Sequence, residues 1–586
     1  MLGSPANRFM PSLVLPQRNA PTRFQSALFA IKASACRWRR RFQELNRAQQ
    51  RRLLQKAVAE ETPILSESRS LLYPSETAAE FSLQAGKVQN LRIAAQHLNG
   101  RCISAGEVFG FWAHVPRPTR GLGFVKGREL REGCVIPSVG GGLCQLSNAL
   151  YDAALLAGFE TVERHAHSRR LPGSQAASGR DATVFWNYVD LRLRPSMDCQ
   201  LEVLLTRSEL IVRFRANTPK RGTAHVPGVI ENLAEAESCE TCHMTGCFRL
   251  IEPGTLRSKG HTAWLLDAFW PEYDRYLTAR RQPDDWLFTP LNRDRWRIGP
   301  YHWNSAGFKH VREAPFQVLH RSVISRRLAA QGAKRQRAQL RFDEALARRY
   351  AQNLPPEATH LVVSQNLLPW LWRAGVLGGR TFDVLMTRLP LADLQTTLDR
   401  ARSRHPESPT LGDFRADSEL LAEETAALSE ARHWITPHAA IARLAGQRAL
   451  KLDWHIPTTN TDEAHGNEIV FPASTLARKG AYELRAAVRK LGLPLRLIGP
   501  VLEDAAFWDG VETFPASANW LADAGVVVLP AAVENQPRRL LQAIAAGIPV
   551  IASEACGLAG IAGITTIPDG DPAALTEAIA AVLAPA

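Results

Sequence analysis

A regular series of short apolar runs in the second half of the chain constrains the fold more than any other feature. Each run has three to five residues, and helix-like stretches separate most of them. Such runs are typical of strands buried on both faces, and parallel strands need a crossover connection. The pattern therefore predicts a doubly wound α/β architecture, with two Rossmann-like halves. The runs are His360–Val363, Phe382–Met386, Trp434–Thr436, Ala449–Leu452, Ile469–Phe471, Leu495–Ile498, Val526–Leu529 and Val550–Ala552.

Length and charge limit the domains and partners. At 586 residues the chain exceeds a single hydrophobic core, so we expect several domains. The formal net charge of +14 comes mostly from arginine and favours anionic partners, such as phosphorylated substrates or acidic lipids. The sequence has no recognition helix, RNA-binding signature or paired zinc-finger spacing, so we expect no nucleic-acid partner.

Cysteine usage and hydropathy predict the compartment. Nine cysteines in a chain of this size do not make a disulfide framework, and their clustering indicates a reducing environment. No stretch approaches eighteen consecutive apolar residues, and the first 23 residues lack the apolar core of a secretory signal. We therefore expect a cytoplasmic protein, with peripheral contact at the inner face of the membrane as one option.

The first 80 residues divide into a proline-rich tail, expected to be disordered, and a basic helical leader. From Phe24 to about Ala59 the pattern becomes helical, with many arginines and with Trp38 among them. One interpretation is a solvated helix that packs on the next domain. The other is an arginine-rich surface helix that docks on anionic lipid.

A glycine-rich run delivers Cys144 to the start of an apolar-periodic helix, Gln145–Leu156. The sequence from residue 139 to 147 reads Val-Gly-Gly-Gly-Leu-Cys-Gln-Leu-Ser. Backbone N–H groups and the positive end of the helix dipole stabilise a thiolate at such a place. Around this helix we expect a mixed α and β domain at 81–220, with a helix at Val88–Leu98. Its expected strands are Glu107–Trp112, Cys134–Pro137, Glu160–His165, Thr183–Asp190, Gln200–Thr206 and Glu209–Arg215.

Residues from about 90 to 194 resemble the VanW family of bacterial cell-envelope proteins. The matching residues include Asn90-Leu91-Arg92, Gly140 to Ser147, Glu163-Arg164-His165 and Gly179 to Val184. The resemblance implies a role at the cell envelope, but it implies no particular reaction.

The order of polar residues in this domain is that of a transglutaminase-like or papain-like site. Cys144 would attack an acyl carbon, His165 or His167 would move the proton, and Asp181 or Asp190 would orient the imidazole. Gln145 or the backbone N–H of Cys144 could stabilise the oxyanion. The alternative is a non-catalytic module that binds a cell-wall precursor, in which Cys144 is structural.

A cysteine-rich knuckle follows, within the linker 221–255. Cys239, Cys242 and Cys247 have the spacing of thiolate ligands for zinc. The string Cys-Xaa-Xaa-Cys-His also attaches haem, but haem is rejected because no export signal occurs and the third cysteine would be idle. The alternative is three reduced cysteines in a linker.

The remainder, from about residue 250, resembles a GT-B glycosyltransferase. The resemblance is carried by Phe471-Pro472-Ala473, Arg478-Lys479-Gly480, Glu534 to Pro537 and Gly547 to Ser553. It implies an acceptor half at 256–460, which includes His438 as a candidate base or helix cap. It also implies a donor half at 461–586 that holds a nucleotide sugar.

The resemblance also assigns residues of the donor site. Arg478 and Lys479 would hold the diphosphate, since guanidinium and ammonium groups neutralise phosphates without a metal. Glu534 matches the first acidic residue of the paired-glutamate motif. Gln542 stands where most relatives have a glutamate that contacts the ribose, and Asn535 suits either the donor site or a helix cap.

Together these observations predict a bacterial VanW-like and glycosyltransferase fusion. The leading hypothesis is retaining transfer of a sugar from a nucleotide donor to a glycan or wall-precursor acceptor, in envelope or surface-polysaccharide assembly. The alternatives are a Cys144-dependent acyl-transfer or amide-bond enzyme and a non-catalytic binding protein.

Overall fold

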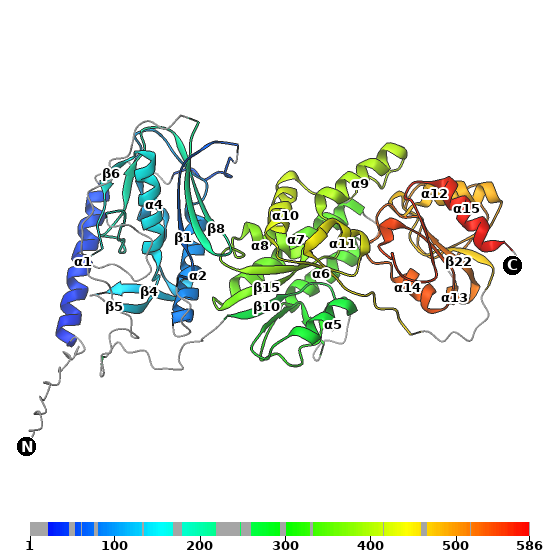
Figure 1. The fold of residues 1–586 in the computed structure, drawn as a ribbon, viewed down its shortest axis with the longest axis horizontal. Coiled ribbons are helices and arrows are strands. Elements are labelled where there is room, and N and C mark those ends of the chain that lie inside the picture. The colour runs from blue at the N-terminus through cyan, green and yellow to red at the C-terminus, as the bar shows by residue number, and fades with distance from the viewer. Residues whose placement is uncertain are drawn as a thin grey trace, which may run out of the picture. The chain divides into compact units, whose positions relative to one another are not determined.

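The computed structural model forms two compact units (Figure 1). Unit 1 is Met1–Gly260 with two short segments, Pro355–Glu357 and Gly378–Arg380, and unit 2 is the rest. The structure describes residues 22–584 except 46–52, 60, 75–79, 132–133, 168–178, 218–246, 248–259, 294–300, 329–331, 414, 459–465, 516 and 518. The expected disordered tail lies outside the described residues.

The core of unit 1 is a four-stranded antiparallel sheet covered by two helices. Along strand β9 every second side chain, Leu210, Val212 and Phe214, is at most 1% exposed. Helix α4 packs on β1 and β9, and helix α2 packs on β8. In sheet order the strands are β1 (Ile64–Leu71), β9 (Glu209–Arg215), β8 (Cys199–Leu205) and β2 (Arg101–Ile103); the helices are α2 (Phe81–Leu98) and α4 (Leu143–Ala157).

Among its described residues, unit 1 also has two smaller sheets and two further α-helices. Strands β3 (Phe109–Gly110), β7 (Arg192–Arg194) and β6 (Glu160–Glu163) form one sheet, and β4 (Lys126–Arg131) pairs with β5 (Cys134–Val139). The helices are α1 (Arg23–Leu45) and the short α3 (Phe111–His114). No described helix combines the length and the apolarity that a membrane span requires.

Three of the expected strands in unit 1 are wrong or shortened. The expected strand Glu160–His165 ends as β6 at Glu163. The run Thr183–Asp190 is an irregular segment with one bridge, between Phe185 and Val189. The run Glu107–Trp112 keeps only β3, because α3 begins at Phe111; within α3 the Trp112 N–H donates to Asp190 Oδ1 (3.1 Å). The expected helix at Val88 begins earlier, at Phe81.

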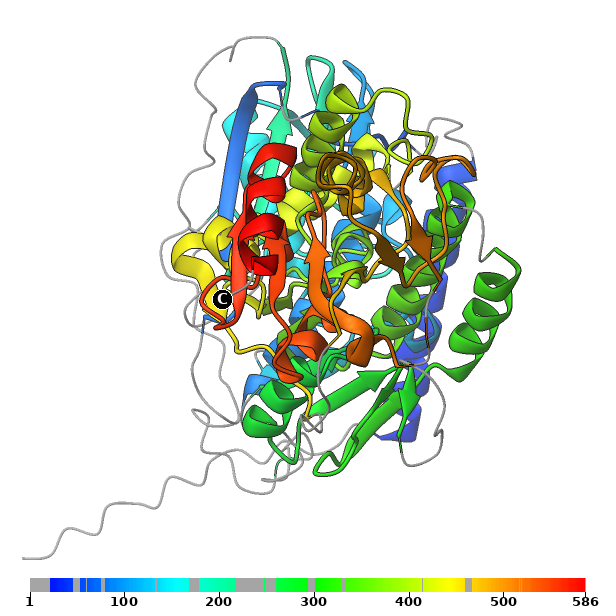
Figure 2. The same cartoon turned by 90° about the vertical axis from the view of Figure 1, so that its right-hand side faces the viewer.

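Unit 2 contains two parallel sheets, and all eight predicted strands are present in them (Figures 1 and 2). The first sheet runs β14 (His310–Glu313), β11 (Trp286–Thr289), β10 (His261–Leu265), β15 (Ala358–Ser364), β16 (Thr381–Leu385), β17 (Trp434–Thr436) and β18 (Ala449–Lys451). The second runs β21 (Thr513–Phe514), β20 (Leu495–Leu497), β19 (Glu468–Phe471), β22 (Ala524–Leu529), β23 (Val550–Ser553) and β24 (Ile564–Ile567). These are the two halves of a GT-B architecture.

Helices connect and cover the strands of unit 2, and a two-stranded parallel pair, β12 (Leu291–Asn292) with β13 (His302–Trp303), lies apart from the main sheets. In the first half the helices are α5 (Pro271–Arg280), α6 (Pro315–Arg327), α7 (Gly332–Asn353), α8 (Leu368–Arg373), α9 (Leu391–Arg404), α10 (Ser418–Glu430) and α11 (Ala439–Ala445). In the second they are α12 (Ala481–Leu491), α13 (Trp520–Asp523), α14 (Arg538–Ala545) and α15 (Pro572–Leu583).

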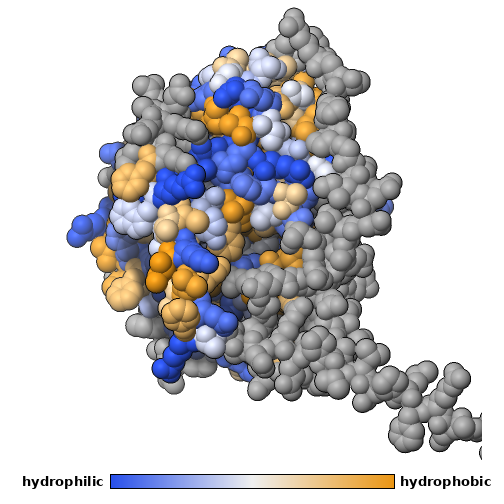
Figure 3. All heavy atoms as spheres, turned by 90° about the vertical axis from the view of Figure 1, so that its left-hand side faces the viewer, coloured by the Kyte–Doolittle hydropathy of each residue, from blue (hydrophilic) through white to orange (hydrophobic). Residues whose placement is uncertain are grey.

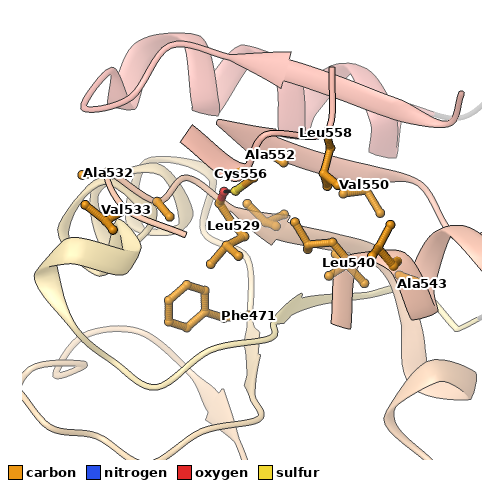
Figure 4. Packing of buried hydrophobic residues seen from close by; sticks show 14 of the residues in the cluster. Phe471, Leu529, Ala532, Val533, Leu540, Ala543, Val550, Ala552, Cys556 and Leu558 are labelled. Atoms are coloured by element: carbon orange, nitrogen blue, oxygen red, sulfur yellow. Dashed lines mark hydrogen bonds between the residues drawn. The ribbon is translucent and has the colours of Figure 1, made fainter. Parts of the chain in front are cut away.

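Apolar side chains fill the second half of unit 2 (Figure 4). Phe471, Leu529, Leu540 and Val550 are at most 2% exposed and lie in the same cluster. Cys556 is enclosed in this packing, where its Sγ donates to Leu529 O (3.6 Å). Burial raises the pKa of the Cys556 thiol to about 12, so this cysteine is a core residue.

One arginine from the second half of unit 2 is held by three residues of the first. The Arg538 guanidinium donates to both Glu272 oxygens, at 2.6 and 2.7 Å, and the Glu272 side chain is fully buried. The guanidinium carbon also lies 5.2 Å and 5.4 Å from the ring centroids of Trp270 and Trp454. The ion pair and the two cation–π contacts therefore join the halves at one point.

We expect Arg538→Ala to lower the free energy of unfolding of unit 2 by about 3 kcal/mol, because it leaves the Glu272 carboxylate buried without its cation. The matched control is Arg443→Ala, since Arg443 pairs with Glu554 at 3.4 Å with both side chains largely exposed. That loss should stay below about 1 kcal/mol. Urea unfolding followed by circular dichroism measures both, and equal losses would contradict the assignment.

Candidate functional site

The glycine-rich loop fixes where α4 begins and so where Cys144 lies. Gly142, the residue before α4, has φ +98°, and a Cβ there would lie 2.1 Å from Lys87 Cγ. A Cβ on Gly141 would lie 2.4 Å from Gly127 O. The buried Asn90 secures the loop by donating to Gly141 O at 2.9 Å. Cys144 is thereby placed second in α4, where backbone N–H groups have no partner within the helix.

The segment 182–184 lies along the first turns of α4. The Cys144 thiol donates to Val184 O (3.8 Å), and Ser147 Oγ donates to Ala182 O (2.5 Å). Asn148 Oδ1 accepts from the Ala182 N–H at 2.7 Å. These bonds bring Asp181, the residue just before this segment, to the start of the helix that bears the cysteine.

His167 lies between Asp181 and Cys144. Its Nδ1 is 2.8 Å from Asp181 Oδ2, and its backbone N–H donates to the same oxygen at 2.6 Å. The Cys144 side chain is also among the groups that raise the pKa of this ring. Burial alone would lower the pKa of His167, but Asp181 and Cys144 outweigh burial and raise it to about 9. The ring is therefore an imidazolium at neutral pH.

Arg164 holds the Asp181 carboxylate in place. Its Nε donates to Asp181 O and its Nη2 to Asp181 Oδ1, both at 2.8 Å. Burial would raise the pKa of Asp181, but the hydrogen bonds and charge of His167, together with the Arg164 charge, lower it to about 2. Sequence reasoning gave Arg164 no role, although an arginine near two histidines and a candidate aspartate was a usable signal.

The structure separates the remaining candidates from the thiol. His165 is half-exposed, with its Nε2 3.3 Å from Glu163 Oε1. Asp190 pairs with Arg192 at 3.2 Å. Gln145 Nε2 donates to Leu71 O and Ser70 Oγ, so this side chain is engaged away from the thiol. Of the alternatives left open by the sequence, the structure brings together Cys144, His167 and Asp181.

Lys87 is a second residue that sequence reasoning missed. It is buried under the glycine-rich loop, against Gly142. Burial lowers the pKa of Lys87 to about 7; the charge of Arg128 lowers it further and that of Glu80 opposes this. Nothing in the sequence distinguishes this lysine from a surface lysine of α2.

The donor-site candidates gather at the carboxyl ends of β19 and β22. Lys479 Nζ donates to Glu534 Oε2 (2.8 Å) and to Val533 O (3.1 Å), and both side chains of the pair are nearly buried. Burial lowers the pKa of both Lys479 and Arg478. Burial would raise the pKa of Glu534, but the charges of Lys479 and Arg478 lower it. The three residues form one compensated charge cluster.

Asn535 and Gln542 differ in how they lie. Asn535 directly follows Glu534 and is half-buried, whereas Gln542 is exposed on α14.

His438 reaches the cluster from the first half of unit 2: its Nε2 donates to Glu534 O (3.0 Å) and Ala555 O (3.2 Å). Its Nδ1 accepts from the Ile441 N–H and caps α11. Burial lowers the pKa of His438, so the imidazole is neutral and acts as a cap.

The expected zinc knuckle lies largely outside the described residues, which include Cys247 but not Cys239 or Cys242. Cys247 is a free cysteine. In the part of the chain that the structure describes, no group of three histidine, cysteine or carboxylate side chains could hold a metal ion.

Two family models match this chain. Residues 86–215 match the family of VanW-like proteins, and residues 481–585 match the group 1 glycosyl transferases. The vancomycin B-type resistance protein VanW of Enterococcus faecalis is 32% identical over 146 residues, which is 24% of this chain and 53% of that protein. The uncharacterized protein YoaR of Bacillus subtilis is 32% identical over 113 residues, 19% of this chain and 37% of that protein.

Solved structures resemble part of this chain at low sequence identity. HepE of Anabaena, in complex with UDP and glucose, has a TM-score of 0.33 and 13% identity, over 56% of this chain and 90% of that one. Sucrose-phosphate synthase of Thermosynechococcus elongatus has a TM-score of 0.33 and 18% identity over the same shares. WaaG, a glycosyltransferase of lipopolysaccharide biosynthesis, has a TM-score of 0.32 and 15% identity, over 55% of this chain and 90% of that one.

Unit 1 therefore contains a VanW-like domain, and unit 2 ends in a group 1 glycosyltransferase domain on a GT-B architecture. The chain therefore carries two separate segments, each of which matches one of these families. It spans about half the length of its VanW relative and about a third of YoaR.

We expect Gly142→Ala to destabilise the start of α4 by roughly 3 kcal/mol, from a left-handed backbone and a collision with Lys87. Gly106→Ala is the control, because Gly106 has φ +76° with nothing within 4 Å of an added Cβ. Its loss should be about 1 kcal/mol. Hydrogen exchange of the α4 amides measures the local destabilisation by Gly142→Ala, and thermal unfolding measures the loss of stability in both variants. Similar losses would mean that the contact with Lys87 is not tight.

Proposed function

We propose that unit 2 transfers a sugar from a nucleotide donor, with retention of configuration, to a glycan or wall-precursor acceptor in envelope or surface-polysaccharide assembly. The observation that carries the proposal is the charge cluster of Arg478, Lys479 and Glu534 within and beside the matched glycosyltransferase domain. In α/β folds with parallel sheets, ligands bind at the carboxyl ends of the strands, where this cluster lies.

The cluster suits a departing nucleoside diphosphate. As the bond between sugar and phosphate breaks, negative charge accumulates on the leaving phosphate, and a preorganised cation stabilises it. Lys479 is held at the site by Glu534, so its ammonium is positioned before the donor arrives. We assign Arg478 and Lys479 to the diphosphate and Glu534 to the donor sugar. Asn535 and Gln542 are assigned to the hydroxyls of the nucleoside.

Unit 1 contributes its VanW-like domain to the same task. We propose that this domain handles a wall-related acceptor and that the protein works at the cytoplasmic face of the membrane. The match to the vancomycin-resistance protein supports a cell-wall context, and it covers only part of that protein.

Thermal unfolding with UDP, GDP or ADP tests the donor site. One nucleotide should raise the melting temperature, because a ligand at 100 times its Kd adds about 2.7 kcal/mol to the stability of the folded state. Lys479→Ala should abolish this rise, measured against the variant's own melting temperature without nucleotide. Lys490→Ala, at an exposed position near the end of α12, is the control and should keep it. No rise with any of the three would contradict the proposal.

The leader helix supplies a membrane contact in this proposal. Phe24, Leu28, Ile31, Trp38 and Phe42 recur at helical spacing on one face of α1, and each is 41–75% exposed. The opposite face is used within unit 1: Ala33 is buried, and Arg40 donates to Glu163 (2.7 Å). Figure 3 looks onto the side of the molecule that carries α1, where hydrophobic residues lie among hydrophilic ones.

Basic side chains flank this apolar stripe. Lys32, Arg39 and Arg41 are exposed, and the Arg41 guanidinium carbon lies 5.9 Å from the Trp38 ring centroid. An apolar stripe bordered by cations matches the interface of an anionic bilayer, where aromatic rings lie at the level of the lipid headgroups. The occupant that we propose for this face is therefore a membrane with acidic lipids.

The double substitution Trp38→Ser with Phe42→Ser should reduce binding to vesicles of phosphatidylglycerol and phosphatidylcholine at least about tenfold. It removes two aromatic side chains that the proposal places in the lipid interface. Phe29→Ser is the control: Phe29 is 58% exposed but lies off the stripe. Co-sedimentation measures the bound fraction, and pure phosphatidylcholine should bind less. If the wild-type protein binds neither vesicle, or self-associates through this face in sedimentation equilibrium, the membrane proposal fails.

A further inference from the structure

We propose that Cys144, His167 and Asp181 form a second active site, in which the Cys144 thiol takes the acyl group of an amide or ester substrate as a thioester. This activity is independent of glycosyl transfer. It is also chemically distinct, since it breaks a bond at an acyl carbon rather than at a sugar.

The three side chains are arranged in the order that nucleophilic catalysis requires. Asp181 accepts from His167 Nδ1 (2.8 Å), which leaves the other ring nitrogen, Nε2, available for the proton transfer, and Cys144 is among the groups that raise the pKa of the ring. Arg164 fixes the far oxygen of Asp181, so the carboxylate orients the ring and is itself oriented. The bonds from Ser147 Oγ to Ala182 O and from the Ala182 N–H to Asn148 Oδ1 hold the cysteine helix against the same segment. The arrangement therefore rests on bonds from three separate parts of unit 1.

The charges around the thiol favour its reactive form. Asp181 and Cys144 raise the pKa of His167 and so favour the protonated ring, and Arg164 pairs with the far oxygen of Asp181. A positive ring beside the sulfur and the N-terminal end of α4 both stabilise a thiolate. Two other cysteines, Cys199 and Cys556, are buried in apolar packing, and burial raises the pKa of each to about 12.

The reaction balances without an oxidant or a metal. Cys144 Sγ attacks the carbonyl carbon, and the N–H of Cys144 at the helix start is placed to donate to the oxyanion. The bond from carbon to the amine or alcohol then breaks, and the leaving group takes the proton from His167 Nε2. In the second half, water or an amine gives a proton back to His167 and attacks the thioester, which releases the Cys144 thiolate. The net result is hydrolysis or transfer of the acyl group.

Alkylation of the full-length protein with iodoacetamide, followed residue by residue with peptide mass spectrometry, tests the reactive thiol. At pH 6 an ordinary thiol has lost most of its reactive form. Cys144 should nevertheless react at least about tenfold faster than Cys36, which is exposed on α1, although Cys144 is half-buried. If Cys144 is no faster than Cys36 at pH 6 in the wild-type protein, the proposal is overturned, whatever the variants do.

Two matched histidine variants test the ring. His167→Gln should slow alkylation of Cys144 at least about tenfold, because the neighbouring positive charge is lost. His165→Gln removes the half-exposed histidine two residues away and should change the rate less than about twofold. Hydrogen exchange across α4 establishes that the His167→Gln protein is folded there. Equal rates in the two variants would exclude His167 as the partner of the thiol.

Incubation with p-nitrophenyl acetate tests the acyl step itself. We expect one acetyl group on Cys144, released by hydroxylamine as a thioester is, and none in Cys144→Ser. Acetylation spread over lysines, with none on Cys144, would show that the thiol does not accept acyl groups. Because this readout needs no nucleotide, its failure is separate from failure of the donor-site proposal.

Discussion

The geometry of the candidate site in unit 1 depends on the hydrogen bonds that the Asp181 carboxylate accepts. One oxygen accepts the backbone N–H of His167 and lies against its ring nitrogen, and the other accepts from Arg164. The chain around His167 has left strand β6, so the regular hydrogen bonds of a sheet no longer position it. Hydrogen bonds to a charged group contribute roughly 1.5–3 kcal/mol each. The hydrogen bonds of this one carboxylate, rather than those of a β-sheet, therefore position the His167 ring.

The same principle operates in unit 2 at two other carboxylates. Glu534 is compensated by Lys479, and Glu272 by Arg538. A buried carboxylate that loses its cation is strongly destabilised, whereas the paired group is tolerated and fixed in direction. Each pair joins elements that are distant in sequence, so the charges determine geometry as much as they contribute stability.

All eight apolar runs that the sequence analysis named in unit 2 are strands. The edge strands β14, β21 and β24 were missed because their half-exposed sequences carry no continuous apolar run. The interior strands β10 and β11 were missed as well, although their apolar side chains are buried, because their runs are short and lie between polar residues. Thr183–Asp190 was wrong for a related reason: its aromatic residues look like a strand, yet they surround an irregular turn. An apolar pattern in the sequence indicates that a segment is buried, but a buried segment can be a strand or a packed loop.

For the candidate site, the sequence supplied the residue types and their order, and the structure supplied the choice among them. His165 and His167 are equivalent by motif, and only the tertiary bonds to Asp181 separate them. Arg164 and Lys87 were missed because their roles come from burial and from partners far away in the chain. Charge compensation is a property of the folded chain, so local pattern cannot reveal it.

The contact of Arg538 with both Trp270 and Trp454 has a spectroscopic consequence. The two indoles are stacked, with centroids 6.1 Å apart, and both belong to the first half of unit 2, whereas the guanidinium comes from the second. Any separation of the halves would withdraw a cation from both ring faces at once. Intrinsic tryptophan fluorescence therefore reports that movement without an attached dye.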